Sequence, residues 1–155
     1  MRIKTNYIAI SLITFFVAVV GSRLTFAGLG WYDNLNLPVI APDGSIIGLV
    51  WTVIYTLSTI AAILFWNTPR GKNFMIIADL FLLNAFLNMF WSLLFFVLHS
   101  FLWAIVEMGL LNLVNLALIV LLWKYNRKSA ILLVPYFLWV SFATYLAYLI
   151  GSLNS

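Results

Sequence analysis

Cysteine and charge are the scarcest features of this chain. None of its 155 residues is a cysteine, which excludes disulfides, thiolate nucleophiles and cysteine ligands for metals or haem. Only 8% of its residues are charged, against about 25% in soluble domains. It has one histidine and four acidic residues, and we find no Ser-His-Asp set, carboxylate pair or glycine-rich phosphate loop. The sequence therefore lacks the usual signatures of hydrolytic and metal-dependent enzymes.

Apolar residues make up 65% of the chain, and its mean hydropathy is +1.11. Such a chain has too few polar residues to cover a surface that faces water. A membrane-spanning helix needs about 20 apolar residues, and five such runs use nearly the whole sequence. We therefore predict an all-α, polytopic membrane protein, a single domain over residues 1–155 with helices at about 6–26, 45–66, 73–98, 100–123 and 129–152.

The basic residues predict the orientation of this bundle. If all five runs cross the membrane, seven of the eight basic residues lie on one side: Arg2, Lys4, Arg70, Lys72, Lys124, Arg127 and Lys128. Only Arg23 falls at the other face. Because basic residues in short loops stay in the cytoplasm, we expect a cytoplasmic N-terminus and an outer C-terminus in a bacterial cytoplasmic membrane. The net charge of +4 is then a topology signal that also attracts anionic lipid, and we expect no nucleic-acid partner.

The first apolar run and the segment after it need separate interpretation. The run follows Arg2 and Lys4 and so resembles a secretory signal peptide, but it exceeds the usual apolar core of roughly 7–15 residues. We interpret it as a retained helix. The segment 27–44 is the only long loop, and it carries Trp31 and Tyr32. We expect this loop to form a lid over the outer end of the bundle.

Several helices carry polar and aromatic residues on one face, at i, i+4 and i+7 spacing. By the rise of 1.5 Å per residue, most of these residues lie between the midplane and the outer face. They are Trp51, Tyr55, Asn84, Asn88, Trp91, Trp139, Phe142 and Ala143. Their convergence predicts a mostly apolar pocket with a few hydrogen-bonding groups. The alternative is that the asparagines only join helices and that the aromatic rings form core.

Two ionisable residues are expected near the outer ends of their helices. Arg23 and Glu107 are predicted to form a structural ion pair, which would offset the cost of burying both charges. Two alternatives are that Arg23 extends outward to the interface and that Glu107 is a proton-coupled carboxylate. His99 is alone in a turn, and we predict no metal site.

The order and spacing of several motifs resemble the translocator protein family, also called the tryptophan-rich sensory or peripheral benzodiazepine receptor family. The resemblance covers about residues 21–153. It rests on Gly21-Ser22-Arg23, Trp31-Tyr32, Gly48 to Thr52 with Tyr55, Leu87-Asn88 to Trp91, Trp103-Ala104 with Glu107, and Pro135-Tyr136 with Trp139 and Phe142-Ala143-Thr144. The chain departs from the family's loop pattern at Leu37, Ile40 and Asp43, where a basic residue, a tryptophan and a proline are usual.

The resemblance implies a dimeric five-helix bundle whose pocket opens toward the long loop. It implies tetrapyrrole ligands, together with isoquinoline or benzodiazepine-type compounds, and no required cofactor beyond a tetrapyrrole as ligand. The pocket residues carried over by position are Trp31, Tyr32, Trp51, Tyr55, Asn84, Asn88, Trp91, Trp139, Phe142 and Ala143.

Three functions remain open from the sequence. The leading one is a membrane protein that binds porphyrins, as a sensor or in porphyrin handling. The second is an enzyme that degrades porphyrin in light and oxygen, with Trp31, Tyr32 or Trp139 as the oxidisable residue. The third is a small-molecule transporter with Glu107 as coupling group, which the odd number of spans and the single acidic site oppose.

Small residues suggest where two copies meet, because they let helix backbones approach closely. Ala78 and Ala85 lie seven residues apart in the third helix, and Ala18 and Ser22 lie four apart in the first. We predict a homodimer through the third or the first helix. On helical geometry, Ala78 and Ala85 are expected to face away from the pocket residues.

Overall fold

The computed structural model describes residues 5–154, and these fold into helices and connecting turns with no strand among them. The helices are α1 (Thr5–Tyr32), α2 (Gly44–Trp66), α3 (Phe74–Ser92), a short π-helix η1 (Leu93–Val97), α4 (Phe101–Tyr125) and α5 (Arg127–Asn154). Because η1 continues α3, there are five helical spans, each long and apolar enough to cross a membrane. The predicted all-α, five-span fold is confirmed.

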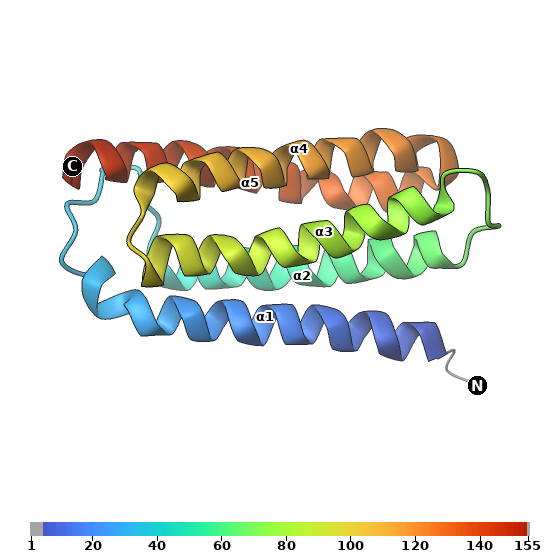
Figure 1. The fold of residues 1–155 in the computed structure, drawn as a ribbon, viewed down its shortest axis with the longest axis horizontal. Coiled ribbons are helices and arrows are strands. Elements are labelled where there is room, and N and C mark those ends of the chain that lie inside the picture. Colours follow the sequence, from blue (N-terminus) through green and yellow to red (C-terminus); the bar gives the residue numbers. More distant parts are fainter. Residues whose placement is uncertain (1–4, 155) are drawn as a thin grey trace.

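The five spans form a closed ring. Around it, α1 packs against α2, α2 against α5, α5 against α4, α4 against α3, and α3 against α1. Figure 1 shows α4 and α5 along one side of the bundle, α1 along the opposite side, and the two termini at opposite ends. This order brings α1, α2 and α3 together, although few backbone positions of α2 and α3 come close to each other. A space remains between these three helices.

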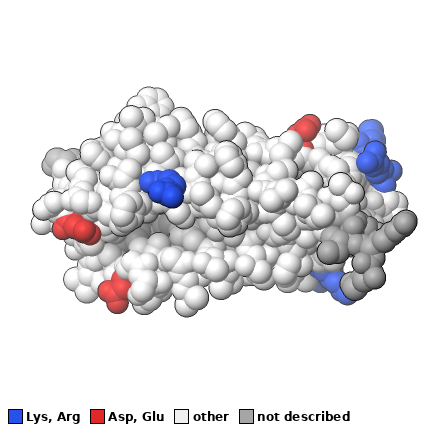
Figure 2. Space-filling view, turned by 90° about the horizontal axis from the view of Figure 1, so that it is seen from below, with Lys and Arg blue, Asp and Glu red and all other residues white. Residues whose placement is uncertain are grey.

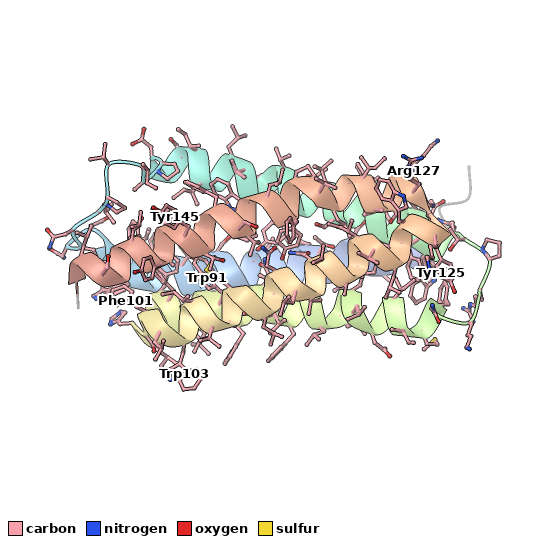
Figure 3. The ribbon with its side chains drawn as sticks, turned by 90° about the horizontal axis from the view of Figure 1, so that it is seen from above. Trp91, Phe101, Trp103, Tyr125, Arg127 and Tyr145 are labelled. Carbon is pink, nitrogen blue, oxygen red and sulfur yellow. The ribbon has the colours of Figure 1, made fainter. Side chains whose placement is uncertain are left out.

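The outer surface is apolar, as expected for a protein surrounded by lipid. Exposed large side chains include Phe15, Phe26, Leu102 and Leu113, all more than three-fifths exposed. Trp103 belongs to this surface too, and Figure 3 shows it pointing away from the bundle. Figure 2 shows one face, on which most basic side chains gather toward one end. Acidic side chains lie at the opposite end, and another acidic side chain lies near the basic end.

The first connection is shorter than predicted. The expected loop 27–44 is a segment of eleven residues, 33–43, because α1 continues through Trp31 and Tyr32. The Trp31 ring stacks on His99 at 4.0 Å, and the Tyr32 ring lies 5.7 Å from Phe96. Packing against the end of the third span therefore holds these two residues in the helix, and they do not belong to a free lid.

The third span ends in a π-helix, which the sequence did not indicate. In η1 the Leu98 N–H donates to the Leu93 carbonyl, five residues back, at 2.9 Å. His99 then adopts a positive φ of 51°, a conformation that reverses the chain and is uncommon outside glycine. α1 crosses η1 so closely that a Cβ on Gly28 would lie 2.1 Å from the Phe96 carbonyl oxygen. Glycine at position 28 is thus required by this crossing.

Candidate ligand-binding site

Three spans are joined at mid-depth by a chain of side-chain hydrogen bonds. The Tyr55 hydroxyl on α2 donates to Asn88 Oδ1 on α3 at 2.6 Å. Asn88 Nδ2 in turn donates to the Tyr136 hydroxyl oxygen on α5 at 2.7 Å. Tyr136 is 3% exposed and Asn88 4%, so these bonds form away from lipid. A buried amide thus uses both its acceptor and one of its donors to join two phenols.

One turn earlier on α3, a second amide makes a different connection. Asn84 Nδ2 donates to Asn115 Oδ1 on α4 at 2.8 Å. Asn84 and Asn88 therefore link α3 to α4, α2 and α5. The interpretation that these asparagines join helices is supported, and it accounts for why polar residues are retained at membrane depth.

An aromatic cluster packs next to these hydrogen bonds. The Trp51 ring lies 5.6 Å from Tyr55, 6.1 Å from Tyr136 and 6.5 Å from Trp91. Figure 3 shows Trp91 between the helices. The Trp91 Nε1–H is buried without a hydrogen-bond partner in the described part of the chain. The rings of this cluster pack against one another, and they contact one side of the Tyr55–Asn88–Tyr136 hydrogen-bond chain.

A cavity of about 380 Å³ lies between α1, α2 and α3, on the other side of the hydrogen-bonded groups. This volume falls within the range of roughly 300–1,000 Å³ found for small-molecule sites. Its floor is polar and is made by Tyr55, Ser58, Asn84, Asn88 and Tyr136, and its walls are largely apolar and include Ile10, Ile13, Val17, Phe65, Phe81 and Leu82. The cavity extends toward the α2–α3 turn, where Trp66 and Met75 line it.

This position differs from the one that the sequence predicts. The expected pocket lies in the half of the bundle beneath the long loop, whereas the cavity lies in the half nearer the α2–α3 turn. Three of the ten predicted residues line it, namely Tyr55, Asn84 and Asn88. The aromatic rings of the expected half pack against one another, and the cavity lies instead between α1, α2 and α3.

The other seven predicted residues fall into three places. Trp51 and Trp91 lie in the aromatic cluster. Trp139 and Phe142 pack together on α5 with ring centroids 5.5 Å apart, one residue before Ala143, and the Trp139 Nε1–H has no partner among described residues. Trp31 and Tyr32 end α1. None of these seven lines the cavity.

Two kinds of residue that line the cavity were not included in the predicted site. Ser58 shares the helical face of Trp51 and Tyr55, and Tyr136 lies one turn before Trp139, so their spacing was a usable signal. The α1 residues Ile10, Ile13 and Val17 carried no signal, because the helix is apolar on every side. Ser58 lines the cavity, and its buried Oγ makes no hydrogen bond within residues 5–154.

The predicted Arg23–Glu107 ion pair is not formed. Glu107 is 5% exposed, and neither of its carboxylate oxygens has a hydrogen-bond partner among the described residues. Arg23 is exposed on α1 beside a shallow hollow that Ser22 and Phe26 also line. Gly21 marks the inward face of α1, and two residues turn a helix by about 200°. Arg23 therefore points away from the bundle.

The small residues proposed for a dimer interface on α3 face inward. Ala78 and Ala85 both line the cavity, because it spans more than one row of α3 side chains. The expectation that they face away from the pocket residues is wrong. On α1, Gly21 is buried, Ala18 is half-buried and Ser22 is exposed, so this helix retains an outward small-residue face.

A ring of five apolar helices, joined by buried amides and enclosing a cavity, defines a polytopic helical membrane protein with an internal ligand-sized site. Comparison with known proteins gives the family. The chain belongs to the TspO/MBR family, whose sequence model matches residues 9–153.

Named relatives share most or all of their length with this chain. It is 34% identical to the tryptophan-rich protein TspO of Bacillus cereus, over 99% of this chain and 100% of that protein. It is 29% identical to the membrane protein YtaB of Bacillus subtilis, over 99% of both. It is 30% identical to the human translocator protein, over 83% of this chain and 78% of that protein. The five spans and these bacterial relatives identify an integral, multi-pass protein of the bacterial membrane.

Proposed function

We propose that this protein binds flat, largely apolar ligands in the cavity between α1, α2 and α3, as a sensor or handling protein for tetrapyrroles. The observation that carries the proposal is the 380 Å³ cavity with apolar walls and a polar floor. The resemblance to the translocator protein family supplies the ligand class, which includes isoquinoline and benzodiazepine-type compounds as well as porphyrins.

The lining suits such ligands chemically. Phe65 and Phe81 contribute aromatic rings to the lining, and contacts between aromatic rings add about 0.5–1.5 kcal/mol beyond area burial. On the floor, Ser58 Oγ is without a partner. The Tyr136 hydroxyl also lies at the floor, where it accepts from Asn88. These two hydroxyls can orient a carbonyl or carboxyl group of the ligand.

The same lining argues against haem as the preferred tetrapyrrole. The only imidazole of the chain, His99, lies in the α3–α4 turn, at the end of α3 opposite the cavity mouth, and there is no cysteine. Without an imidazole or thiolate to ligate iron, metal-free protoporphyrin should bind at least as tightly as haem. Haem binding that is more than tenfold tighter would contradict this expectation.

Fluorescence titration of the purified protein with protoporphyrin, haem and an isoquinoline carboxamide tests the proposal. Ala85→Leu fills the cavity and should weaken binding at least tenfold. Ala143→Leu adds the same volume in the half of the bundle that the sequence favoured and should change affinity less than twofold. If Ala143→Leu alone weakens binding, the site lies among Trp139 and Phe142, and the cavity is not the site.

The degradation of porphyrin in light is less well supported by the geometry. It requires an oxidisable ring against the macrocycle, and the predicted candidates Trp31, Tyr32 and Trp139 do not line the cavity. Illumination of the protein with protoporphyrin decides the point. Equal degradation rates for wild type and for Tyr32→Phe or Trp139→Phe would exclude those side chains from the chemistry.

A further inference from the structure

One charged residue contributes to the lining of the cavity. Asp79 on α3 lies near its mouth, together with Asn6 of α1 and Met75 of α3, and among residues 5–154 no lysine or arginine lines it. Asp79 is exposed and makes no ion pair with any residue in the described range 5–154. The nearby Arg70 guanidinium packs over the Phe74 ring, 5.4 Å from its centroid. The carboxylate at the mouth is therefore free to interact with a ligand.

Asp79 and the polar floor lie at the two ends of an apolar space. Asp79 precedes Asn88 by nine residues, which is roughly 14 Å along α3 at 1.5 Å per residue. Between these levels the lining is mainly apolar and includes Ile10, Ile13 and Phe81. A ligand that fills this length needs an apolar body, and its polar head group then lies at the Asp79 carboxylate.

We infer that Asp79 determines the charge preference of the cavity, which takes an amphipath with a protonated amine at the mouth and an apolar body toward Tyr55 and Asn88. An ammonium group can donate a charge-assisted hydrogen bond to the carboxylate, whereas a carboxylate placed at the mouth is repelled by it. The carboxyl groups of a tetrapyrrole are therefore expected at the polar floor and away from Asp79. The inference rests on the proposed function, because it requires that ligands occupy this cavity.

Three pyrene probes with the same alkyl chain separate charge from shape: pyrenebutylamine, pyrenebutanol and pyrenebutyrate. Fluorescence titration in neutral detergent should show that the wild type binds the amine most tightly, the alcohol less tightly and the carboxylate least tightly. The affinities for the amine and the carboxylate should differ about tenfold. Asp79→Asn removes the charge with little change of shape. It should lower amine affinity about fivefold and leave alcohol affinity within twofold, as expected for an ion pair near the interface.

Asp43→Asn is the matched control, because it makes the same change in net charge in the connection at the other end of the bundle. It should leave all three affinities within twofold, and Asp79→Glu should retain the preference for the amine. Equal losses of amine binding in Asp43→Asn and Asp79→Asn would overturn the inference, as would an unchanged amine affinity in Asp79→Asn.

The outcome for pyrenebutanol separates this inference from the proposed function. If the alcohol binds and Ala85→Leu abolishes its binding, the cavity is a ligand site, and the charge series alone then judges Asp79. If the alcohol does not bind the wild type, or binds equally well to Ala85→Leu, both the proposed function and the inference fail.

Discussion

Asn88 occupies a demanding position, since it hydrogen-bonds two phenols at once. Tyr55 donates to its oxygen and its nitrogen donates to Tyr136. Leaving a buried polar group without a partner costs about 1–3 kcal/mol, although single hydrogen bonds between membrane helices average only about 0.6 kcal/mol. The side chain therefore stabilises the bundle through two bonds made at once.

A double-mutant cycle measures this role. Asn88→Ala should lower the free energy of unfolding in detergent by about 1–3 kcal/mol, because both phenols lose their bond to this side chain. Tyr55→Phe alone should cost about 0.6 kcal/mol, and it should cost much less in the Asn88→Ala background. Asn112→Ala is the control, since it breaks one bond to the exposed Ser141 hydroxyl. Additive losses for Tyr55→Phe and Asn88→Ala would show that the two side chains are not coupled.

At the scale of the element, the crossing of α1 over η1 depends on Gly28. The 2.1 Å that would separate a Cβ here from the Phe96 carbonyl oxygen is far below van der Waals contact, and the clashing atom belongs to the backbone. A side chain at this position would force the two helices apart. At Gly30, two residues later, an added Cβ would meet no heavy atom within 4 Å.

Gly28→Ala and Gly30→Ala form a matched pair of substitutions. Gly28→Ala should lower the free energy of unfolding by about 1–3 kcal/mol, as overpacking does. Gly30→Ala should be neutral or stabilising by up to about 1 kcal/mol, because alanine favours the helix. Thermal unfolding of both variants in the same detergent provides the measurement. Equal unfolding temperatures would contradict the tight crossing.

The spans could be predicted from the sequence because the thickness of the bilayer sets their length and composition. Their ends could not, because tertiary contacts decide them: Trp31 and Tyr32 stay helical by packing on His99 and Phe96. The site was predicted in part. Helical spacing brought Asn84 and Asn88 together correctly, but α1 is apolar on every side, so spacing did not show which of its faces meets the bundle or that Arg23 points outward.

At the scale of the whole molecule, the distribution of charge predicts how the protein lies in the membrane. Arg70 and Lys72 lie in the α2–α3 connection, and Lys124, Arg127 and Lys128 lie at the α4–α5 connection at the same end of the bundle. Asp33 and Asp43 bound the connection at the opposite end. By the positive-inside rule, the basic end is expected to be cytoplasmic.

The absence of cysteine makes this orientation directly measurable. Val39→Cys in the 33–43 connection should react with a membrane-impermeant maleimide on intact cells. Pro69→Cys in the α2–α3 connection should react only after the cells are permeabilised. The wild type should remain unlabelled, because it has no thiol. The reverse pattern of labelling would place the N-terminus outside.

Association of two copies is expected through α1, because the small residues of α3 face the cavity. Ser22→Cys lies on the outward face of α1 and should form a disulfide-linked dimer when membranes are oxidised. Leu113→Cys, on the exposed face of α4, is the control and should remain monomeric. Cross-linking through Leu113→Cys and not through Ser22→Cys would assign the interface to α4.

The sparse packing of α1 has a consequence for the order in which the protein assembles. Only Val17, Gly21 and Gly28 of this helix are buried, and its contacts are with α2, α3 and η1. Membrane helices insert before they pack against one another, and α1 is synthesised before every helix that it contacts. Its full set of contacts can form only after the third span has been inserted. The first helix made therefore completes its packing after later helices are in place, and this packing closes one wall of the cavity.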